Sequence, residues 1–259
     1  MSRDNTAGAI SDRTFIWLFI YFVDGGLTPF ECINMVYNHP KLHVAVDCVI
    51  FGYEEGELKL LLWPRDIEPE SGKWSLMGGF VQESESVENA AMRVLQRTTG
   101  LKDIYMEQVA AFSEVGRDPG ARVISIAFAA LIRVDKYDKE LVHQSGALWW
   151  PVNKLPELIF DHGQIIAGGF RTLQSRASNE LIGKELLPDK FTLMQLRLLY
   201  EAIFQRPFDP GNFRKKVLSL GVLERLNIKN TTESKKGAYY YKFNGQDEVA
   251  YNDRIFKIH

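Results

Sequence analysis

The chain has 259 residues, of which 46% are hydrophobic and 25% are charged, and its formal net charge is −2. This length allows two folded domains with buried cores, and the small net charge excludes a general attraction of the whole chain to polyanions. The two cysteines, Cys32 and Cys48, exclude a disulfide framework and lack metal-ligand spacing, so a reducing cytoplasm is the expected location.

An N-terminal extension is predicted over residues 1–34. Its apolar run at 15–23 is shorter than the ~20 residues that span a bilayer, so no membrane association is expected. Asp4 and Asp12 dilute the positive charge that precedes the apolar segment of a signal peptide. Met35 begins a segment that reads as an ordinary domain start. We therefore interpret the extension as a mis-assigned start or a poorly anchored segment.

The next part of the chain predicts a sheet. Residues 43–52 and 58–63 are rich in apolar and β-branched side chains and predict two strands joined as a hairpin. Asp47, inside the first run, is interpreted as a polar residue at a strand end. Three further runs of this character are predicted as strands: 105–115, 122–134 and 147–152.

A helix is predicted over residues 165–177, directly after Phe160-Asp161-His162. Gly168 and Gly169 are expected to weaken this helix, because glycine has a low helix propensity. His162 is interpreted as a residue of the helix start rather than a catalytic base.

The most specific motif runs from Gly79 to Leu101. Glu85 lies six residues after Gly79, Arg93 lies fourteen residues after it, and Gly100 closes the stretch. Between these anchors, Ser86 can cap a helix and Gly100 can end it. This spacing resembles the Nudix box, G-x5-E-x7-R-E-U-x-E-E-x-G-U, in which U is aliphatic.

The glutamates that follow the arginine of the Nudix box are replaced here by Val94, Arg97 and Thr98. These positions are spaced i, i+3 and i+4, so they share one helix face. Magnesium requires several hard oxygen ligands, which a hydrocarbon, a cation and a hydroxyl do not supply. We therefore expect a domain that keeps its pocket and lacks hydrolytic chemistry, with no catalytic residue, no metal and no cofactor.

The loop from Arg117 to Arg122 is the strongest ligand-binding signal in this domain. Its guanidinium groups suit phosphates or vicinal hydroxyls, and the carboxylate of Asp118 can accept hydrogen bonds from a sugar. In Nudix proteins this loop borders the substrate cavity; the alternative is a solvated hairpin tip with an internal salt bridge. The predicted effector-binding residues are Arg65, Trp74, Gly79, Phe80, Arg117, Asp118 and Arg122.

The C-terminal part, 189–245, is basic, with eleven Lys and Arg and five Asp and Glu. Thr192 and Gln195 form a capping-box signature before an apolar helix. Asp209 and Pro210 begin a second helix that ends at a glycine. Two predicted strands, 222–228 and 237–243, then enclose a loop that carries lysines. Helix, turn, basic helix and hairpin together indicate a winged helix-turn-helix.

DNA binding is the function that this arrangement favours over a merely solvated charged face. A helix of this size fits the major groove, and lysines of the wing can meet phosphates. The predicted DNA-binding residues are Thr192, Gln195, Asn212, Arg214, Lys215, Lys216, Lys235 and Lys236.

The order of the parts, with segments such as WSLMGGFV and NFRKKVLSLG, resembles the Nudix-related transcriptional regulators. This resemblance implies an α/β fold, a Nudix α/β/α sandwich followed by a C-terminal winged helix-turn-helix. The expected boundaries are an extension at 1–34, an effector-sensing Nudix domain at 35–177, a linker at 178–188, a DNA-binding domain at 189–245 and a tail at 246–259.

The resemblance also implies a function. Members of this family bind a double-stranded DNA operator as homodimers, and they respond to a small-molecule effector, either ADP-ribose or the sugar L-arabinose of carbohydrate metabolism. The missing glutamates and the loop sequence look more similar to the sugar-sensing branch.

Two other functions remain open at this stage. An active Nudix pyrophosphohydrolase on nucleoside-diphosphate derivatives would need relocated carboxylates, such as Glu83, Glu88 or Glu114. A protein-binding adaptor would use the winged helix as an interaction surface. The sequence does not decide between repression and activation.

Overall fold

The computed structural model describes residues 40–54, 56–66, 68–102, 104–134, 139–184, 186–232, 237–245 and 255–256. The predicted extension at 1–34 lies outside the described residues, as do Lys235 and Lys236. The chain divides into the units Met1–Lys41 and Leu42–His259, and the fold below is that of the second unit. Within the described part, no helix combines the length and apolar character needed to cross a membrane.

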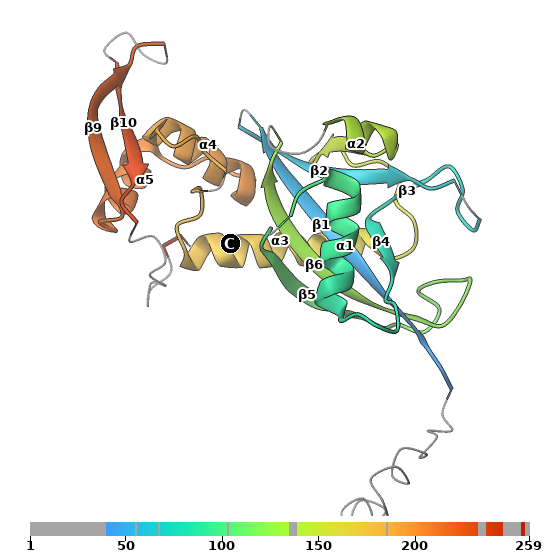
Figure 1. Ribbon diagram of the computed structural model, residues 1–259. Helices are drawn as coiled ribbons and strands as arrows, with labels where there is room; N and C mark the ends of the chain where they lie inside the picture. The colour runs from blue at the N-terminus through green and yellow to red at the C-terminus, as the bar shows by residue number, and fades with distance from the viewer. Residues whose placement is uncertain are drawn as a thin grey trace, which may run out of the picture. The chain divides into compact units, whose positions relative to one another are not determined.

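A seven-stranded mixed sheet forms the centre of the N-terminal domain (Figure 1). Its central strand β1, His43–Glu54, runs antiparallel to β2, Glu57–Pro64, and parallel to β6, Val123–Arg133. The predicted hairpin of β1 and β2 is confirmed. The remaining strands are β3, Trp74–Ser75; β4, Met77–Phe80; β5, Met106–Phe112; and β7, Leu148–Pro151.

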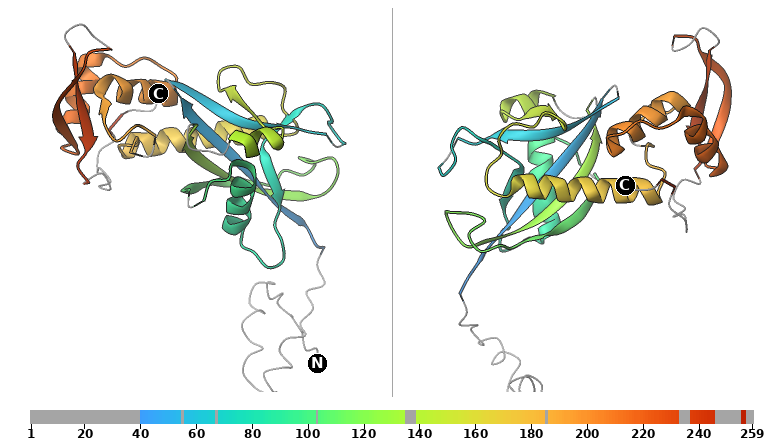
Figure 2. Two further views of the ribbon diagram at one scale, coloured as in Figure 1. Left: turned by 45° about the horizontal axis from the view of Figure 1, so that its top comes forward. Right: turned by 180° about the vertical axis from the view of Figure 1, so that it is seen from behind.

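Two helices cover opposite faces of this sheet, α1 in the front view of Figure 1 and α3 in the view from behind of Figure 2. Helix α1, Val87–Thr99, has the caps that the sequence predicts: Ser86 Oγ accepts from the Asn89 amide, and Gly100 is left-handed with φ 73°. Helix α3 spans His162–Asn179, and the short helix α2, Lys139–Gln144, was not expected. The predicted α/β sandwich is confirmed.

The paired glycines of α3 allow the helix to approach the sheet closely. A Cβ atom at Gly169 would lie 3.0 Å from a methyl group of Val49 in β1, and one at Gly168 would lie 3.0 Å from Val109 in β5. The expectation that these glycines weaken the helix considers propensity alone. In the fold, the missing side chains are what lets α3 pack against β1 and β5.

The C-terminal domain is a winged helix. Thr192 and Gln195 form the predicted capping box at the start of α4, and the side chain of Asp209 caps α5. The three-stranded sheet has the order β8-β10-β9. The elements are β8, Phe191–Thr192; α4, Leu193–Phe204; α5, Pro210–Ser219; β9, Leu223–Asn230; and β10, Ala238–Phe243.

An aromatic cluster fills the core of the winged helix. Tyr200 of α4 contacts Phe213 of α5 with ring centroids 5.7 Å apart, and Phe213 stacks on Phe256 at 5.3 Å with an interplanar angle of 7°. Phe256 lies beyond the predicted boundary at residue 245. This buried aromatic ring is therefore part of the winged-helix core, although the sequence assigns it to the tail.

Helix α3 is joined to α4 by hydrogen bonds as well as by apolar packing. The Tyr200 hydroxyl accepts from the Ile182 amide at 2.9 Å and donates to the Glu180 carbonyl at 3.1 Å, just after α3 ends. The Gln174 side chain donates to the Ile203 carbonyl at 3.1 Å. Both ends of the α3–α4 contact are thus fixed by buried or half-buried polar groups.

Replacing Gly169 by valine is expected to lower the free energy of unfolding by about 1–3 kcal/mol, because the added methyl groups overlap Val49. Gly163→Ala is the matched control, since a Cβ there meets no atom within 4 Å. This control should be neutral or stabilise by up to about 1 kcal/mol. Urea unfolding followed by circular dichroism measures both, and equal midpoints for Gly169→Val and the wild type would contradict the close approach.

Candidate functional site

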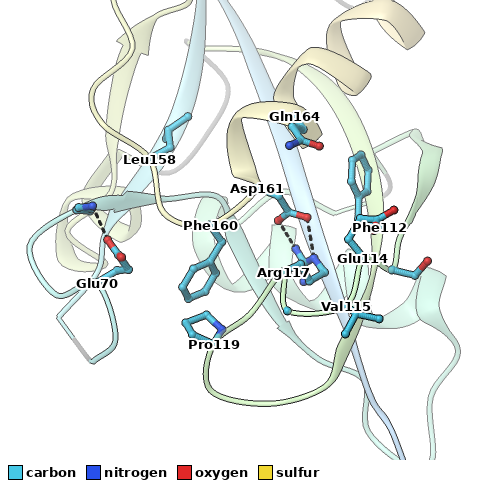
Figure 3. A pocket seen from close by; sticks show the side chains of 13 residues that line it. Glu70, Phe112, Glu114, Val115, Arg117, Pro119, Leu158, Phe160, Asp161 and Gln164 are labelled. Carbon is cyan, nitrogen blue, oxygen red and sulfur yellow. Dashed lines mark hydrogen bonds and ion pairs between the residues drawn. The ribbon is translucent and has the colours of Figure 1, made fainter.

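Two cavities in the N-terminal domain share Arg117 and Phe160. We call the first the box cavity; its volume is about 310 Å³, and it lies beside the Nudix-like motif. We call the second the loop cavity; its volume is about 630 Å³, and the loop between β5 and β6 borders it (Figure 3). The box cavity is lined by Arg65, Gly78, Gly79, Phe80, Arg97 and Asp118 among others. The loop cavity is lined by Glu70, Lys73, Phe112, Glu114, Pro119 and Gln164 among others.

A buried ion pair lies where the two cavities meet. Arg117 donates from Nε and Nη2 to the two carboxylate oxygens of Asp161, at 2.8 and 2.7 Å (Figure 3). The Arg117 side chain is only 4% exposed. Burial alone would lower the pKa of Arg117, but the hydrogen bonds and charge of Asp161 raise it overall, so the guanidinium stays charged. The pair fixes the β5–β6 loop to the start of α3.

Asp47 completes this network from the middle of β1. Its carboxylate accepts from the Ser125 hydroxyl of β6 at 2.6 Å and lies 3.5 Å from Nη2 of Arg117. A Cβ atom at Gly78 would lie 2.7 Å from Oδ1 of Asp47, so Gly78 leaves the space that this carboxylate occupies. The interpretation of Asp47 as a strand-end polar residue is wrong. It is buried inside a strand because partners on two other segments satisfy it.

His162 is held at the first position of α3. Its Nδ1 accepts from the Leu76 amide at 2.9 Å, and Nε2 lies 3.8 Å from Oδ1 of Asp47. Burial lowers the pKa of His162, although Asp47 and Asp161 act in the opposite direction. The ring is therefore neutral at pH 7, with its proton on Nε2. Asp161 precedes it as the N-cap residue and makes no capping hydrogen bond, because Arg117 occupies its carboxylate.

The structure brings five of the predicted effector-binding residues together at the box cavity: Arg65, Gly79, Phe80, Arg117 and Asp118. Arg65 donates from Nε to the Pro69 carbonyl at 2.7 Å, and its guanidinium lies over the Phe160 ring, 5.3 Å from the centroid. The effector-binding role of all these residues stays a prediction.

Two predicted effector residues lie outside the linings of both cavities. Trp74 packs edge-on against Trp150, with ring centroids 5.2 Å apart, at the margin of the hydrophobic core. Arg122 is half-buried and donates to the Glu114 carbonyl at 3.2 Å. The residues that the sequence interpretation missed are Asp47, Ser125, Phe160, Asp161 and Gln164. Asp161 adjoins the predicted helix start, but no local signal pairs it with Arg117.

The candidate DNA-binding residues divide into two groups. Asn212, Arg214 and Lys215 are exposed on α5, and Lys216 beside them is half-buried. Thr192 is fully buried, and its hydroxyl accepts from the Gln195 amide, so its inclusion among surface contacts is corrected. In return, the backbone amide of Thr192 donates to the side-chain oxygen of the half-buried Gln195 at 2.9 Å. Both residues therefore act as a helix cap, and a DNA contact of Gln195 stays a prediction.

The wing carries a pair of cationic side chains, of which the sequence interpretation identified Lys229, as a residue of the wing loop, and not Arg225; the structure places both on β9. The Arg225 guanidinium and the Lys229 ammonium lie 4.6 and 4.8 Å from the centroid of the Tyr239 ring. Their i, i+4 spacing on one strand was the available signal, because alternate residues of a strand share a face. We therefore add Arg225 to the basic residues of the winged helix.

Comparison with known families assigns both halves of the chain. Residues 41–168 match the NUDIX domain family, and residues 183–243 match the NrtR DNA-binding winged helix domain. The chain belongs to the Nudix family. A Nudix domain followed by a winged helix is the arrangement that the sequence predicted, and the winged helix matches the NrtR type.

Relatives of this Nudix chain include a regulator and an enzyme. The chain is 29% identical over 214 residues to the ADPR responsive transcriptional repressor of Acinetobacter baylyi. This aligned region covers 81% of this chain and 85% of the relative. It is 37% identical over 134 residues to the ADP-ribose pyrophosphatase of Methanocaldococcus jannaschii. This aligned region covers 51% of this chain and 73% of the relative. The similarity to the repressor is weaker per residue but spans much more of the chain.

One solved structure matches both domains of this chain, and a second matches its Nudix domain. Shewanella oneidensis NrtR complexed with a 27mer DNA is 27% identical, with a TM-score of 0.70 over 82% of this chain and 98% of that one. The NUDIX domain of the same protein complexed with ADP ribose is 29% identical, with a TM-score of 0.50. The match covers 57% of this chain and 99% of that one.

The Nudix-like motif of this chain does not offer the donor set that a divalent ion requires. Glu85 is held by Arg93 through two hydrogen bonds of 2.9 and 2.6 Å. Val94 is fully buried, and the buried Thr98 hydroxyl donates to the Val94 carbonyl at 2.8 Å. Within the described ranges, no group of three His, Cys, Asp or Glu side chains is placed to hold a metal ion. Hard oxygen ligands are what magnesium needs, so these residues do not fit it.

Removing one partner of the buried ion pair should be more damaging than removing both. Asp161→Ala leaves the Arg117 guanidinium buried without its bidentate partner, and a cost of about 3–5 kcal/mol is expected. The double variant Arg117→Met/Asp161→Ala should recover part of that loss, because no buried guanidinium remains. Denaturant unfolding of the three proteins measures these values. A double variant less stable than Asp161→Ala would contradict the assignment.

His162 should give the protein a pH-dependent stability. Its folded pKa lies below the ordinary value of 6.5, so the unfolded chain binds the proton more readily. The contribution of neutral His162 to the free energy of unfolding is therefore fully present above pH 6.5. It is lost as the pH falls, and the free energy of unfolding then decreases by at most ~1.4 kcal/mol per pH unit.

The matched variant is His162→Gln, whose side-chain oxygen can still accept from the Leu76 amide. Unfolding midpoints from pH 7.5 to 5 should fall more steeply in the wild type than in the variant. Parallel curves would exclude His162 as the titrating group.

Proposed function

We propose that this chain is a DNA-binding transcriptional repressor whose Nudix domain binds a small-molecule effector without hydrolysing it. The observation that carries the proposal is the joining of two features in one chain. A cavity pair bordered by Arg65, Arg97 and Arg117 lies in the Nudix domain, and the helix that starts at this cavity pair contacts α4 of the winged helix. A relative named as a transcriptional repressor covers 81% of this chain, and a structure solved with a 27mer DNA covers 82%.

ADP-ribose is the effector that we propose first. The repressor of A. baylyi carries ADPR in its name, and the NUDIX domain of S. oneidensis NrtR has been solved with ADP ribose. The two adjoining cavities also suit a ligand with two ends. L-arabinose, which the sequence interpretation favoured, has no such support from the relatives, and it becomes the second ligand of the test.

Absence of hydrolysis is proposed from the chemistry of the motif. Val94 and Thr98 are buried, Arg97 is cationic, and the carboxylate of Glu85 is held by Arg93. Glu83, Glu88 and Glu114, the alternatives for relocated ligands, do not form a three-carboxylate group within the described residues. The pyrophosphatase relative keeps hydrolysis as the competing function.

Coupling between effector and DNA is proposed to run through α3. Phe160 lines both cavities, and Asp161 and His162 follow it directly at the helix start. The other end of α3 contacts Tyr200 and Ile203 of α4. An effector that binds one arrangement of this helix better than another changes DNA affinity by its differential binding energy, commonly ~1–3 kcal/mol. A homodimer on a two-fold operator is the proposed DNA-bound form.

The function is tested with the full chain and two ligands. Thermal unfolding is measured with ADP-ribose and with L-arabinose in EDTA, since a ligand at 100 times its dissociation constant stabilises by about 2.7 kcal/mol. ADP-ribose should raise the midpoint and weaken binding to a fragment of the protein's own promoter region, and it should remain intact when excess magnesium replaces the EDTA. Magnesium-dependent turnover of ADP-ribose would favour the pyrophosphatase, and stabilisation by L-arabinose alone would favour the sugar-sensing branch. Failure to bind any promoter fragment would favour the adaptor.

Arg214→Ala is expected to weaken binding to that fragment by about 1–3 kcal/mol if Arg214 contacts a base. Arg214 is exposed on α5, the helix that we propose enters the major groove. Arg171→Ala removes an equally exposed arginine from α3 and is the matched control. A mobility-shift titration compares the two. Equal affinities for both variants and the wild type would rule out Arg214 as a recognition residue.

A further inference from the structure

Arg97 is the one of the three substituted motif positions that reaches the box cavity. Val94 and Thr98 are buried beneath the helix surface, whereas Arg97 is exposed and lines the cavity. No hydrogen bond or ion pair within the described part of the chain holds its guanidinium. An arginine that faces a cavity with its hydrogen-bond donors unused is available to a ligand.

The neighbouring cations differ in how far their charge is already offset. Arg93, one turn earlier on α1, is paired with Glu85, and Arg117 is paired with Asp161. Arg65 hydrogen-bonds to the carbonyls of Pro69 and Glu68 and to no described carboxylate. Two guanidinium groups that lack a carboxylate partner among the described residues, those of Arg65 and Arg97, therefore line the same cavity.

The acidic groups of this cavity are already engaged within the protein. Asp47 accepts from Ser125 and faces Arg117, and Asp118 accepts from the Gly120 amide at 2.8 Å. Guanidinium groups bind phosphate oxygens through paired, charge-assisted hydrogen bonds. A neutral sugar would gain much less from Arg97 than a phosphate ester would.

We infer that Arg97, with Arg65, forms a diphosphate subsite in which a guanidinium takes the place of the divalent ion of a hydrolytic Nudix site. This inference rests on the proposed function, because it assigns the anionic part of the effector to the box cavity. One of the two uncharged ends of such a ligand then extends past Phe160 into the loop cavity, whose lining includes Phe112 and Gln164. The subsite binds the diphosphate without magnesium.

The test titrates inorganic pyrophosphate and ADP-ribose into the full chain by calorimetry, in EDTA. The proteins are the wild type, Arg97→Gln and the control Arg171→Gln, which removes the same charge from an exposed position of α3 outside both cavity linings. Arg97→Gln should weaken pyrophosphate binding at least about tenfold, equivalent to ~1.4 kcal/mol. The control should bind as the wild type does. Unchanged thermal midpoints in the absence of ligand verify that both variants are folded.

The outcomes separate this subsite from the proposed function. Pyrophosphate binding that depends on Arg97, without any binding of ADP-ribose, would support the subsite and refute the proposed effector. ADP-ribose binding that is equal in the wild type and Arg97→Gln would keep the effector and overturn the subsite. The subsite is also overturned if the wild type does not bind pyrophosphate, or binds it only when magnesium is added.

Discussion

The ion pair of Arg117 and Asp161 is the constraint on which the candidate site depends. Two charges are removed from water here, and such burial is tolerated only when each charge finds a well-placed partner. Asp47 and Ser125 extend the pair into the sheet. Because the pair ties the β5–β6 loop to the first turn of α3, it also fixes Phe160, which lines both cavities as Arg117 does. The shape of the site follows from electrostatics as much as from apolar packing.

Local signals predicted the elements of this fold well. Ser86 and Gly100 cap the two ends of α1, and Thr192 and Gln195 cap the start of α4. The β1–β2 hairpin forms where the apolar pattern of the sequence predicts it. Each of these signals acts over a few residues, which is why a single sequence contains it. The α/β sandwich and the winged helix could therefore be expected from the order of the elements, and the family matches agree.

The polar network could not be predicted in the same way. Arg117 and Asp161 are 44 residues apart, and Ser125 and Asp47 are 78 residues apart, so only the sheet brings them together. Asp47 looked incidental because its neighbours are apolar. Trp74 and Thr192 illustrate a related point, since an aromatic ring or a hydroxyl in the sequence does not reveal whether packing or capping already uses it.

The position of Phe256 has a practical consequence for the DNA-binding half. Its ring stacks on Phe213 and contacts Tyr200, so this residue near the C-terminus supplies part of the winged-helix core. A version shortened after the last strand of the wing would leave an aromatic void between α4 and α5. Affinity tags are therefore better attached at the opposite terminus, and a DNA-binding fragment prepared in isolation needs to keep this final aromatic ring.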